Sequence, residues 1–265
     1  MSDELVSVAF PDSVVEIGRD LFRFCGALTT ITIHPDNPAY ASENGVLFNK
    51  DKTELIAYPE GRQDDYVIPD SVVKIGDSAF EDCKGLTSIT IPDSVKEIGD
   101  DAFCNCKGLM SVKIHDSVVT IGFFAFRTEC NTTSITIPAS VIELGFHAVL
   151  GCYVTAHPDN PEYSSEDGVL FNREKTELIS YPKGKHGDYV IPNSVIEIEI
   201  GAFDGCTGLT SIIIPESVTK IGENAFRGCK PYFTVHPDNP AYKSVNGRLE
   251  RKCKLFFGHF NQLGW

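Results

Sequence analysis

The chain has 265 residues, of which 42% are hydrophobic, so it is long enough to bury a core. Its 23 Lys and Arg against 37 Asp and Glu give a formal net charge of −14, which repels phosphate backbones and argues against nucleic acid as a partner. No apolar run has the length of a membrane span, and residues 1–10 lack the basic and apolar regions of an export signal, so we expect no membrane insertion.

Two repeating units fill the chain. A short unit, seen as IPDSVVKIGDSAFEDCKGLTSIT, is interspersed with a longer unit that contains HPDNPAYASENGVLFN. One unit has too few apolar residues to close a core, so we expect the units to stack as one solenoid domain over 1–265. The short units cover 10–32, 68–90, 91–113, 114–136, 137–155, 191–213 and 214–234, and the long units cover 33–67, 156–190 and, in degenerate form, 235–265.

Each short unit predicts a strand, a turn and a short helical segment. The segment 86–92 alternates apolar and polar residues and favours a strand with Leu86, Ile89 and Ile91 inward. Pro-Asp-Ser ends this strand in a turn, and 78–83 predicts a helical turn that points Ala79, Phe80 and Cys83 at the core. In the long units, 45–59 and 168–182 predict β-hairpins that stand out from one side.

The short frame, L-x-x-I-x-I-P-x-S-V-x-x-I-G-x-x-A-F-x-x-C, resembles the BspA-like class of leucine-rich repeats. The resemblance implies a curved right-handed solenoid with a ladder of parallel strands and helical or 3-10 turns on the opposite face. It also implies a surface-exposed or secreted protein that binds host or matrix partners, and no catalytic residues. One departure is Glu199, which replaces a glycine such as Gly76, so this position either does not need a positive φ or is strained in that unit.

Cysteine and histidine recur at fixed positions. The cysteine column predicts a buried ladder of free thiols, although neighbouring coils would also lie within disulfide range. The histidines open HPDNP motifs that lie coils apart and cannot converge on a metal, so we interpret them as turns and expect no metal and no cofactor. The cysteines are Cys25, Cys83, Cys106, Cys152, Cys206 and Cys229, and the histidines are His34, His157 and His236.

The outward side of the strand ladder is the candidate binding surface. Solenoids place such rows on a concave surface, where one ligand contacts several coils, and the acidic row beside them would favour a basic partner or a divalent cation. The alternative is that Thr suits strands and Asp suits the turn after Pro. The candidate residues are Thr29, Thr32, Thr87, Thr90, Lys113, Thr136 and Thr210 in the rows and Asp70, Asp93 and Asp116 at the edge.

These patterns predict a non-catalytic module that binds a host, matrix or cell-surface protein. The motifs H-E-x-x-H, G-x-G-x-x-G and G-x-x-x-x-G-K-[ST] are absent, and the recurring polar residues read as scaffold, so we expect no enzyme. Two alternatives stay open. The chain could assemble end to end through its terminal coils, or the threonine rows could bind glycans.

Overall fold

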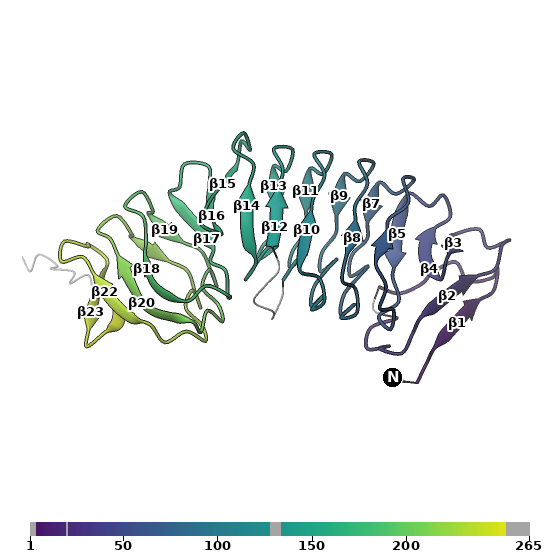
Figure 1. Ribbon diagram of the computed structural model, residues 1–265, viewed down its shortest axis with the longest axis horizontal. Coiled ribbons are helices and arrows are strands. Elements are labelled where there is room, and N and C mark those ends of the chain that lie inside the picture. The colour runs from purple at the N-terminus through teal and green to yellow at the C-terminus, as the bar shows by residue number, and fades with distance from the viewer. Residues whose placement is uncertain (1–3, 20, 128–133, 253–265) are drawn as a thin grey trace, which may run out of the picture.

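The chain winds into an arched solenoid (Figure 1). The computed structural model describes residues 4–19, 21–127 and 134–252. In the described residues each coil contributes one strand to a first ladder, whose strands pair in parallel within four short sheets, and this arrangement confirms the predicted stack of repeats. The ladder strands are β1 (Ser7–Phe10), β2 (Thr30–Ile33), β6 (Tyr66–Val67), β8 (Ile89–Thr90), β10 (Ser111–Lys113), β12 (Ser134–Ile137), β14 (Tyr153–Ala156), β18 (Gly187–Val190), β20 (Leu209–Ile214) and β22 (Tyr232–Val235).

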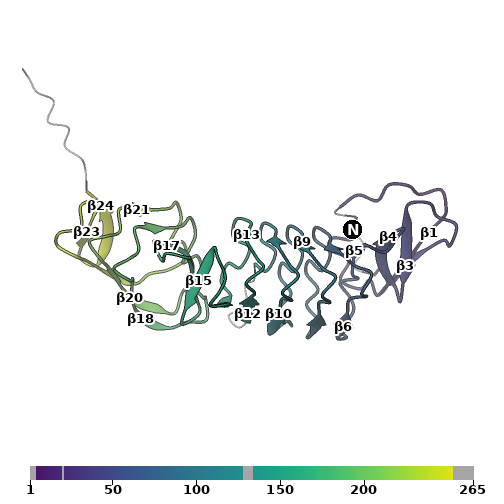
Figure 2. The ribbon, with the colours of Figure 1, turned by 90° about the horizontal axis from the view of Figure 1, so that it is seen from above.

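The first ladder lies on a flank of the arch. Equivalent residues of successive units are paired in parallel, as in Val67 with Thr90 and Lys113 with Thr136. The arch bends in the plane of Figure 1, and the ladder faces the viewer there, whereas the view from above is straighter (Figure 2). The candidate rows therefore lie on a flank and not on the concave edge that we expected.

A second parallel ladder runs along the opposite side (Figure 2). Its strands are only two residues long, and each has an inward Ile or Leu, so the sequence pattern was too short to predict them. They are β7 (Lys74–Ile75), β9 (Glu97–Ile98), β11 (Thr120–Ile121), β13 (Glu143–Leu144), β19 (Glu197–Ile198) and β21 (Lys220–Ile221).

The predicted helical segments are turns in the described residues. Ser78 and Asp82 have φ of 56° and 58°, and left-handed residues at this spacing interrupt a helix. The backbone N–H groups instead bond along the solenoid axis, from Ser78 to Asp100 O at 2.7 Å and from Phe80 to Ala102 O at 2.8 Å. Each turn is thus a further link between coils.

Stacked aromatic rings form the spine of the core. Tyr58, Phe80, Phe103 and Phe126 follow one another with ring centroids 5.1, 4.9 and 5.1 Å apart. All four rings are buried, as predicted for Phe80. Because each ring comes from a different unit, the stack couples units that are distant in sequence.

The cysteine column is buried beside this stack. Cys106 Sγ donates to Phe80 O at 3.0 Å, and Cys152 Sγ donates to Phe126 O at 3.2 Å. All six predicted column members are free thiols, with Cys229 half-buried and the others buried. Burial raises the pKa of Cys152 to about 12, so this thiol stays protonated and unreactive at neutral pH.

Each long unit adds antiparallel strands. β4 follows β3 through a turn in which Asn44 and Gly45 have φ of 51° and 80°, as a type I′ hairpin requires. The predicted hairpin between β4 and β5 is confirmed. The strands are β3 (Tyr40–Glu43), β4 (Val46–Asn49) and β5 (Glu54–Ala57); β15 (Tyr163–Glu166), β16 (Val169–Asn172) and β17 (Glu177–Ser180); and β23 (Tyr242–Val245) and β24 (Arg248–Arg251).

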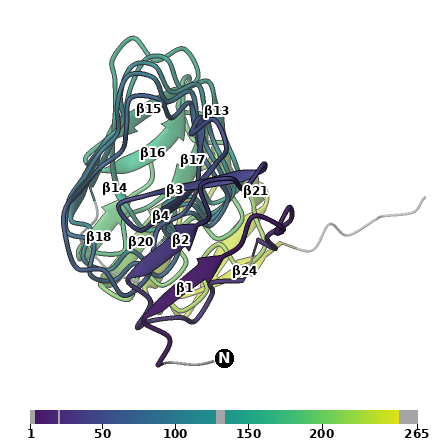
Figure 3. The same ribbon diagram turned by 90° about the vertical axis from the view of Figure 1, so that its right-hand side faces the viewer.

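The middle strands of the long units divide the core, which corrects the expectation that the hairpins stand out. Leu170 packs in the core cluster that precedes β16, and Val169 and Phe171 pack in the cluster that follows it. Leu47 and Phe48 divide in the same way across β4. Figure 3 shows β16 within the outline of the coils. The uninterrupted run Val-Leu-Phe is the sequence signature of a strand that is buried on both faces.

The HPDNP motif anchors each long unit. The Asn160 side chain, fully buried, donates to Pro138 O and Val141 O at 2.7 and 2.8 Å and accepts from the N–H groups of Glu162 and Tyr163 at 2.9 and 2.7 Å. The predicted turn is confirmed, since the N–H of Asp159 donates to Nδ1 of His157 at 3.2 Å. The same asparagine bonds recur at Asn37 and Asn239.

Candidate functional site

The predicted row residues lie on the outer side of the first ladder. Thr90, Lys113 and Thr136 are exposed at equivalent places in β8, β10 and β12. Thr32, Thr87 and Thr210 are exposed as well, and Thr29 is half-buried and donates to Val6 O at 3.2 Å. The sequence therefore predicted correctly which side of each strand faces outward.

Two threonines of the rows bond to carboxylates that we did not predict. Thr87 Oγ1 donates to Asp65 at 2.6 Å, and Thr210 Oγ1 donates to Asp188 at 2.6 Å. The bonds from Thr210 and Ser211 hold the pKa of Asp188 below its usual range. Asp65 and Asp188 are equivalent residues of the two long units, so comparing those units could have revealed them.

Apolar side chains interrupt the hydroxyl rows. Val67 is 68% exposed and Tyr232 is 60% exposed, both on outward positions of ladder strands. Met110, Val190 and Ile213 are exposed along the same flank. Of these, Val190 and Ile213 are register partners in neighbouring strands, whereas the others stand on separate coils.

The acidic edge lies where the ladder strands end. Asp70, Asp93 and Asp116 are exposed in three successive coils and form no ion pair with any residue of 4–19, 21–127 and 134–252. Unpaired charges of one sign in a row add up to a field that attracts cations. The predicted edge is thus exposed and has no ion pair within the described part of the chain.

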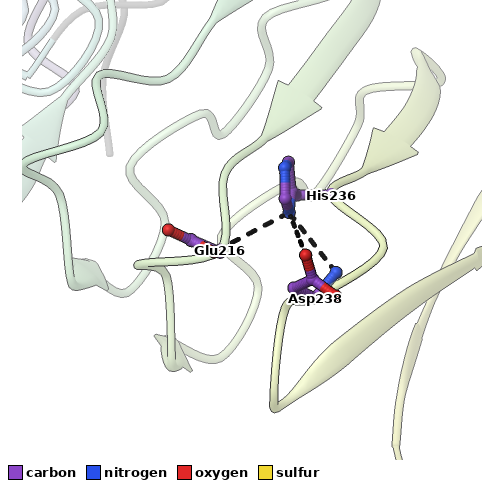
Figure 4. A group of neighbouring side chains, drawn as sticks. All are labelled: Glu216, His236 and Asp238. Atoms are coloured by element: carbon purple, nitrogen blue, oxygen red, sulfur yellow. Dashed lines mark hydrogen bonds and ion pairs between the residues drawn. The ribbon is translucent and has the colours of Figure 1, made fainter.

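An exposed group of Glu216, His236 and Asp238 lies where the last long unit begins (Figure 4). His236 Nδ1 lies 3.9 Å from a Glu216 oxygen and 4.0 Å from an Asp238 oxygen. The same Nδ1 accepts the backbone N–H of Asp238 at 3.3 Å, so its lone pair already serves the turn. We therefore assign no metal to this trio.

The comparison with protein families decides the identity of this scaffold. The family described as the BspA type leucine rich repeat region matches residues 1–64, 57–161 and 181–241 in six copies. The chain belongs to this family. No curated protein matches the chain. The described part of this BspA-type protein contains no helix that could cross a bilayer.

Solved structures of similar fold agree with the family assignment. A leucine rich cell surface protein from Faecalibacterium prausnitzii is 30% identical over 88% of this chain and 60% of its own, with a TM-score of 0.54. The pneumococcal vaccine antigen PcpA is 24% identical over 72% of this chain and 57% of its own, with a TM-score of 0.51. A leucine-rich repeat protein from Eubacterium ventriosum is 22% identical over 89% of this chain and 69% of its own, with a TM-score of 0.54. The BspA-type chain thus spans less than two thirds of the first two proteins.

A second acidic group lies on the other side of this BspA-type solenoid. Glu177, Glu197 and Glu199 come from β17, β19 and the residue after β19, and their carboxylate oxygens lie within 4.8 Å of one another. Lys220 forms an ion pair with Glu197. Glu199, the departure noted in the sequence, therefore gives this coil a carboxylate that other coils lack. The glycines at this position, such as Gly76, do not have a positive φ.

Protonation of Glu177 makes the stability of the protein depend on pH. The hydrogen bond with Glu199, together with burial and the charges of Glu199 and Glu197, raises the Glu177 pKa from 4.5 to about 7. Because the folded state holds this proton more tightly, the stabilisation is complete below pH 4.5 and is lost as the pH rises to about 7. We expect Glu177→Gln to raise the Tm at pH 8 and to leave it nearly unchanged at pH 4, measured by thermal denaturation.

The matched control is Glu54→Gln. Glu54 occupies the same place in the first long unit, where Gly76 stands instead of Glu199. We expect no pH-dependent gain in Tm for this variant. An equal gain in Tm at pH 4 and pH 8 for Glu177→Gln would contradict the hydrogen bond between protonated Glu177 and Glu199.

Proposed function

We propose that this BspA-type protein is a non-catalytic protein-binding or adhesion module that acts at the cell surface or after secretion. It contacts its partner through the first-ladder flank and the acidic edge. The observation that carries the proposal is the row of Asp70, Asp93 and Asp116, which is exposed and has no counter-charge in the described residues. The similarity to a protein described as a leucine rich cell surface protein supports the location.

The charge of the edge indicates the character of the partner. Three carboxylates on successive coils attract a basic surface, and the exposed Val67 and Met110 on the same coils offer apolar contact area. In this proposal the module binds through its outer surface and needs no reaction centre. A host, matrix or cell-surface protein with a basic patch fits this surface.

The test removes the charge of the edge. We expect the triple variant Asp70→Asn, Asp93→Asn, Asp116→Asn to bind a basic matrix protein at least about tenfold more weakly and with a smaller salt dependence. Surface plasmon resonance against a panel of purified basic and acidic matrix proteins, at about 50 and 300 mM salt, measures both.

The matched control makes the same change in net charge elsewhere. Asp51, Glu174 and Glu223 are exposed acidic residues outside the first ladder, and their Asn or Gln variants should bind as the unchanged protein does. Equal affinity and salt dependence for the edge variant would overturn the role of the edge. Growth of mass with concentration in light scattering, without any partner, would favour end-to-end assembly instead.

A further inference from the structure

The second ladder is interrupted by a cavity of about 380 Å³. The cavity lies between β13, which ends one sheet, and β17 and β19, which belong to the next. The second-ladder strands that border it run along the side of the solenoid opposite the first ladder (Figure 2). Its position therefore separates it from the acidic edge and the flank discussed above.

The wall of this junction cavity combines apolar and acidic groups. Phe146, Ile179 and Ile200 supply apolar surface, and Glu177 and Glu199 supply the hydrogen-bonded carboxyl pair. Among the described lining residues His147 is the one basic side chain, and burial lowers its pKa. The cavity is thus shaped for a cation that carries an apolar stem.

The first long unit creates an equivalent junction that is filled. There Arg19 forms an ion pair with Asp77, and Arg23 Nη2 donates to Glu81 at 2.6 Å. The cavity that Arg19, Arg23 and Glu81 line there has a volume of only about 30 Å³. Two guanidinium groups of the chain itself therefore occupy the space between the coils that flank this long unit.

The repeat frame shows why the second junction stays open. Phe146 and Leu150 occupy the positions of Arg19 and Arg23, and Ile200 occupies the position of Asp77. The arginines are thus replaced by apolar residues, while Glu199 replaces a glycine and adds a carboxylate. The two junctions otherwise match, because the hydroxyl groups of Tyr40 and Tyr163 accept the N–H groups of Ile17 and Leu144 at 3.0 and 3.1 Å.

We propose that the junction cavity binds an arginine side chain presented by a partner protein. The guanidinium group forms charge-assisted hydrogen bonds with Glu177 and Glu199, and its methylene stem packs against Phe146 and Ile200. This arginine takes the place that Arg19 and Arg23 fill in the first junction. The site adds a second contact region to the proposed binding module, and its chemistry does not depend on the acidic edge.

The test uses the blocked tripeptide acetyl-Leu-Arg-Leu-amide and its citrulline analogue, which keeps the shape of arginine without the charge. We expect the arginine peptide to shift the amide NMR signals of 144–150 and 198–200 with a Kd on the order of 1 mM. The citrulline peptide should bind at least about tenfold more weakly. This comparison uses the unchanged protein, so it does not depend on how a variant folds.

Two variants locate the site. Glu199→Gly restores the residue of the other coils, and the double variant Phe146→Arg, Ile200→Asp rebuilds the pair of the first junction. We expect each to weaken binding of the arginine peptide at least about tenfold. Thermal denaturation followed by circular dichroism verifies that both variants are folded.

Several outcomes would overturn the proposal. These are no binding at about 10 mM peptide, equal binding of the citrulline analogue, or binding that both variants leave unchanged. Signal shifts confined to Thr90, Lys113 and Thr136 would place the peptide on the first ladder, which rejects the junction cavity and leaves the proposed function standing. The acidic-edge variant provides the converse test. If it loses matrix binding but still binds the arginine peptide, the junction cavity binds independently of the acidic edge.

Discussion

Phe103→Ala is expected to lower the free energy of unfolding by about 3–5 kcal/mol. The Phe103 ring is 2% exposed and stacks on both sides, at 4.9 Å from Phe80 and 5.1 Å from Phe126. Its removal leaves a cavity between coils that the parallel ladders on either side hold at a fixed spacing, so the neighbours cannot collapse into it. Denaturation by urea, followed by circular dichroism, measures the loss.

The control for this variant is Phe123→Ala. Phe123 is 52% exposed, so losing its ring should change the free energy of unfolding by about 0.5 kcal/mol or less. Similar losses for Phe103→Ala and Phe123→Ala would mean that the ring stack does not couple the coils. Loss of cooperativity in Phe103→Ala alone would support the coupling, because repeat proteins fold through contacts between neighbours.

Asn160→Ala is the second large change that we expect, with a loss of about 3–5 kcal/mol. The Asn160 side chain makes four hydrogen bonds to backbone groups, and its truncation leaves two carbonyls and two N–H groups without these partners. The exposed Asn193 offers a matched Asn193→Ala control, for which we expect about 0.5 kcal/mol or less. Denaturation by urea measures both.

Asn160→Asp tests whether the amide donor of Asn160 is needed for stability. A carboxylate still accepts the two N–H groups, but it places an oxygen against Pro138 O and Val141 O, at the positions where Asn160 Nδ2 donates. Protonation restores one donor, so the stability of this variant should recover as the pH falls. A variant that is as stable as the unchanged protein at pH 7 would show that the side-chain amide is not needed.

The repeat allowed the overall fold to be predicted because its spacing fixes both burial and register. A residue such as Phe80 recurs at one position in each short unit, so its neighbours in space follow from the amino-acid sequence alone. The same argument placed Thr90, Lys113 and Thr136 on the outside of the ladder. It could not place these rows on the arch, because curvature depends on small rotations that every coil contributes.

The turns and the middle strands escaped prediction for different reasons. The segment 78–83 resembled a helical turn, although the repeat position of Asp82 holds Asn105 and Gly205 in other units, which favour the left-handed conformation that all three adopt. The run Val169–Phe171 was interpreted as a projecting hairpin strand, although uninterrupted apolar residues indicate burial on both faces. The Asn44-Gly45 pair, which favours a type I′ turn, pointed to the first hairpin strand that we missed.

The junction cavity illustrates a limit of reasoning from repeats. Glu199 stood out in the sequence as a departure from glycine, but its partner Glu177 lies in another kind of unit, and only the structure brings them together. The same holds for Arg19 and Asp77, which are separated by a whole long unit. Departures from a repeat are therefore best compared in pairs across the inserted units.

The inner strands β4 and β16 have a mechanical consequence. The two faces of each strand belong to different core clusters, so the solenoid contains three hydrophobic cores in series. A molecule held at one end and pulled at the other would unfold one core at a time, because unfolding that stops at β4 or β16 leaves the next core protected from water. The length of chain released in each unfolding step would report the positions of β4 and β16 in the chain.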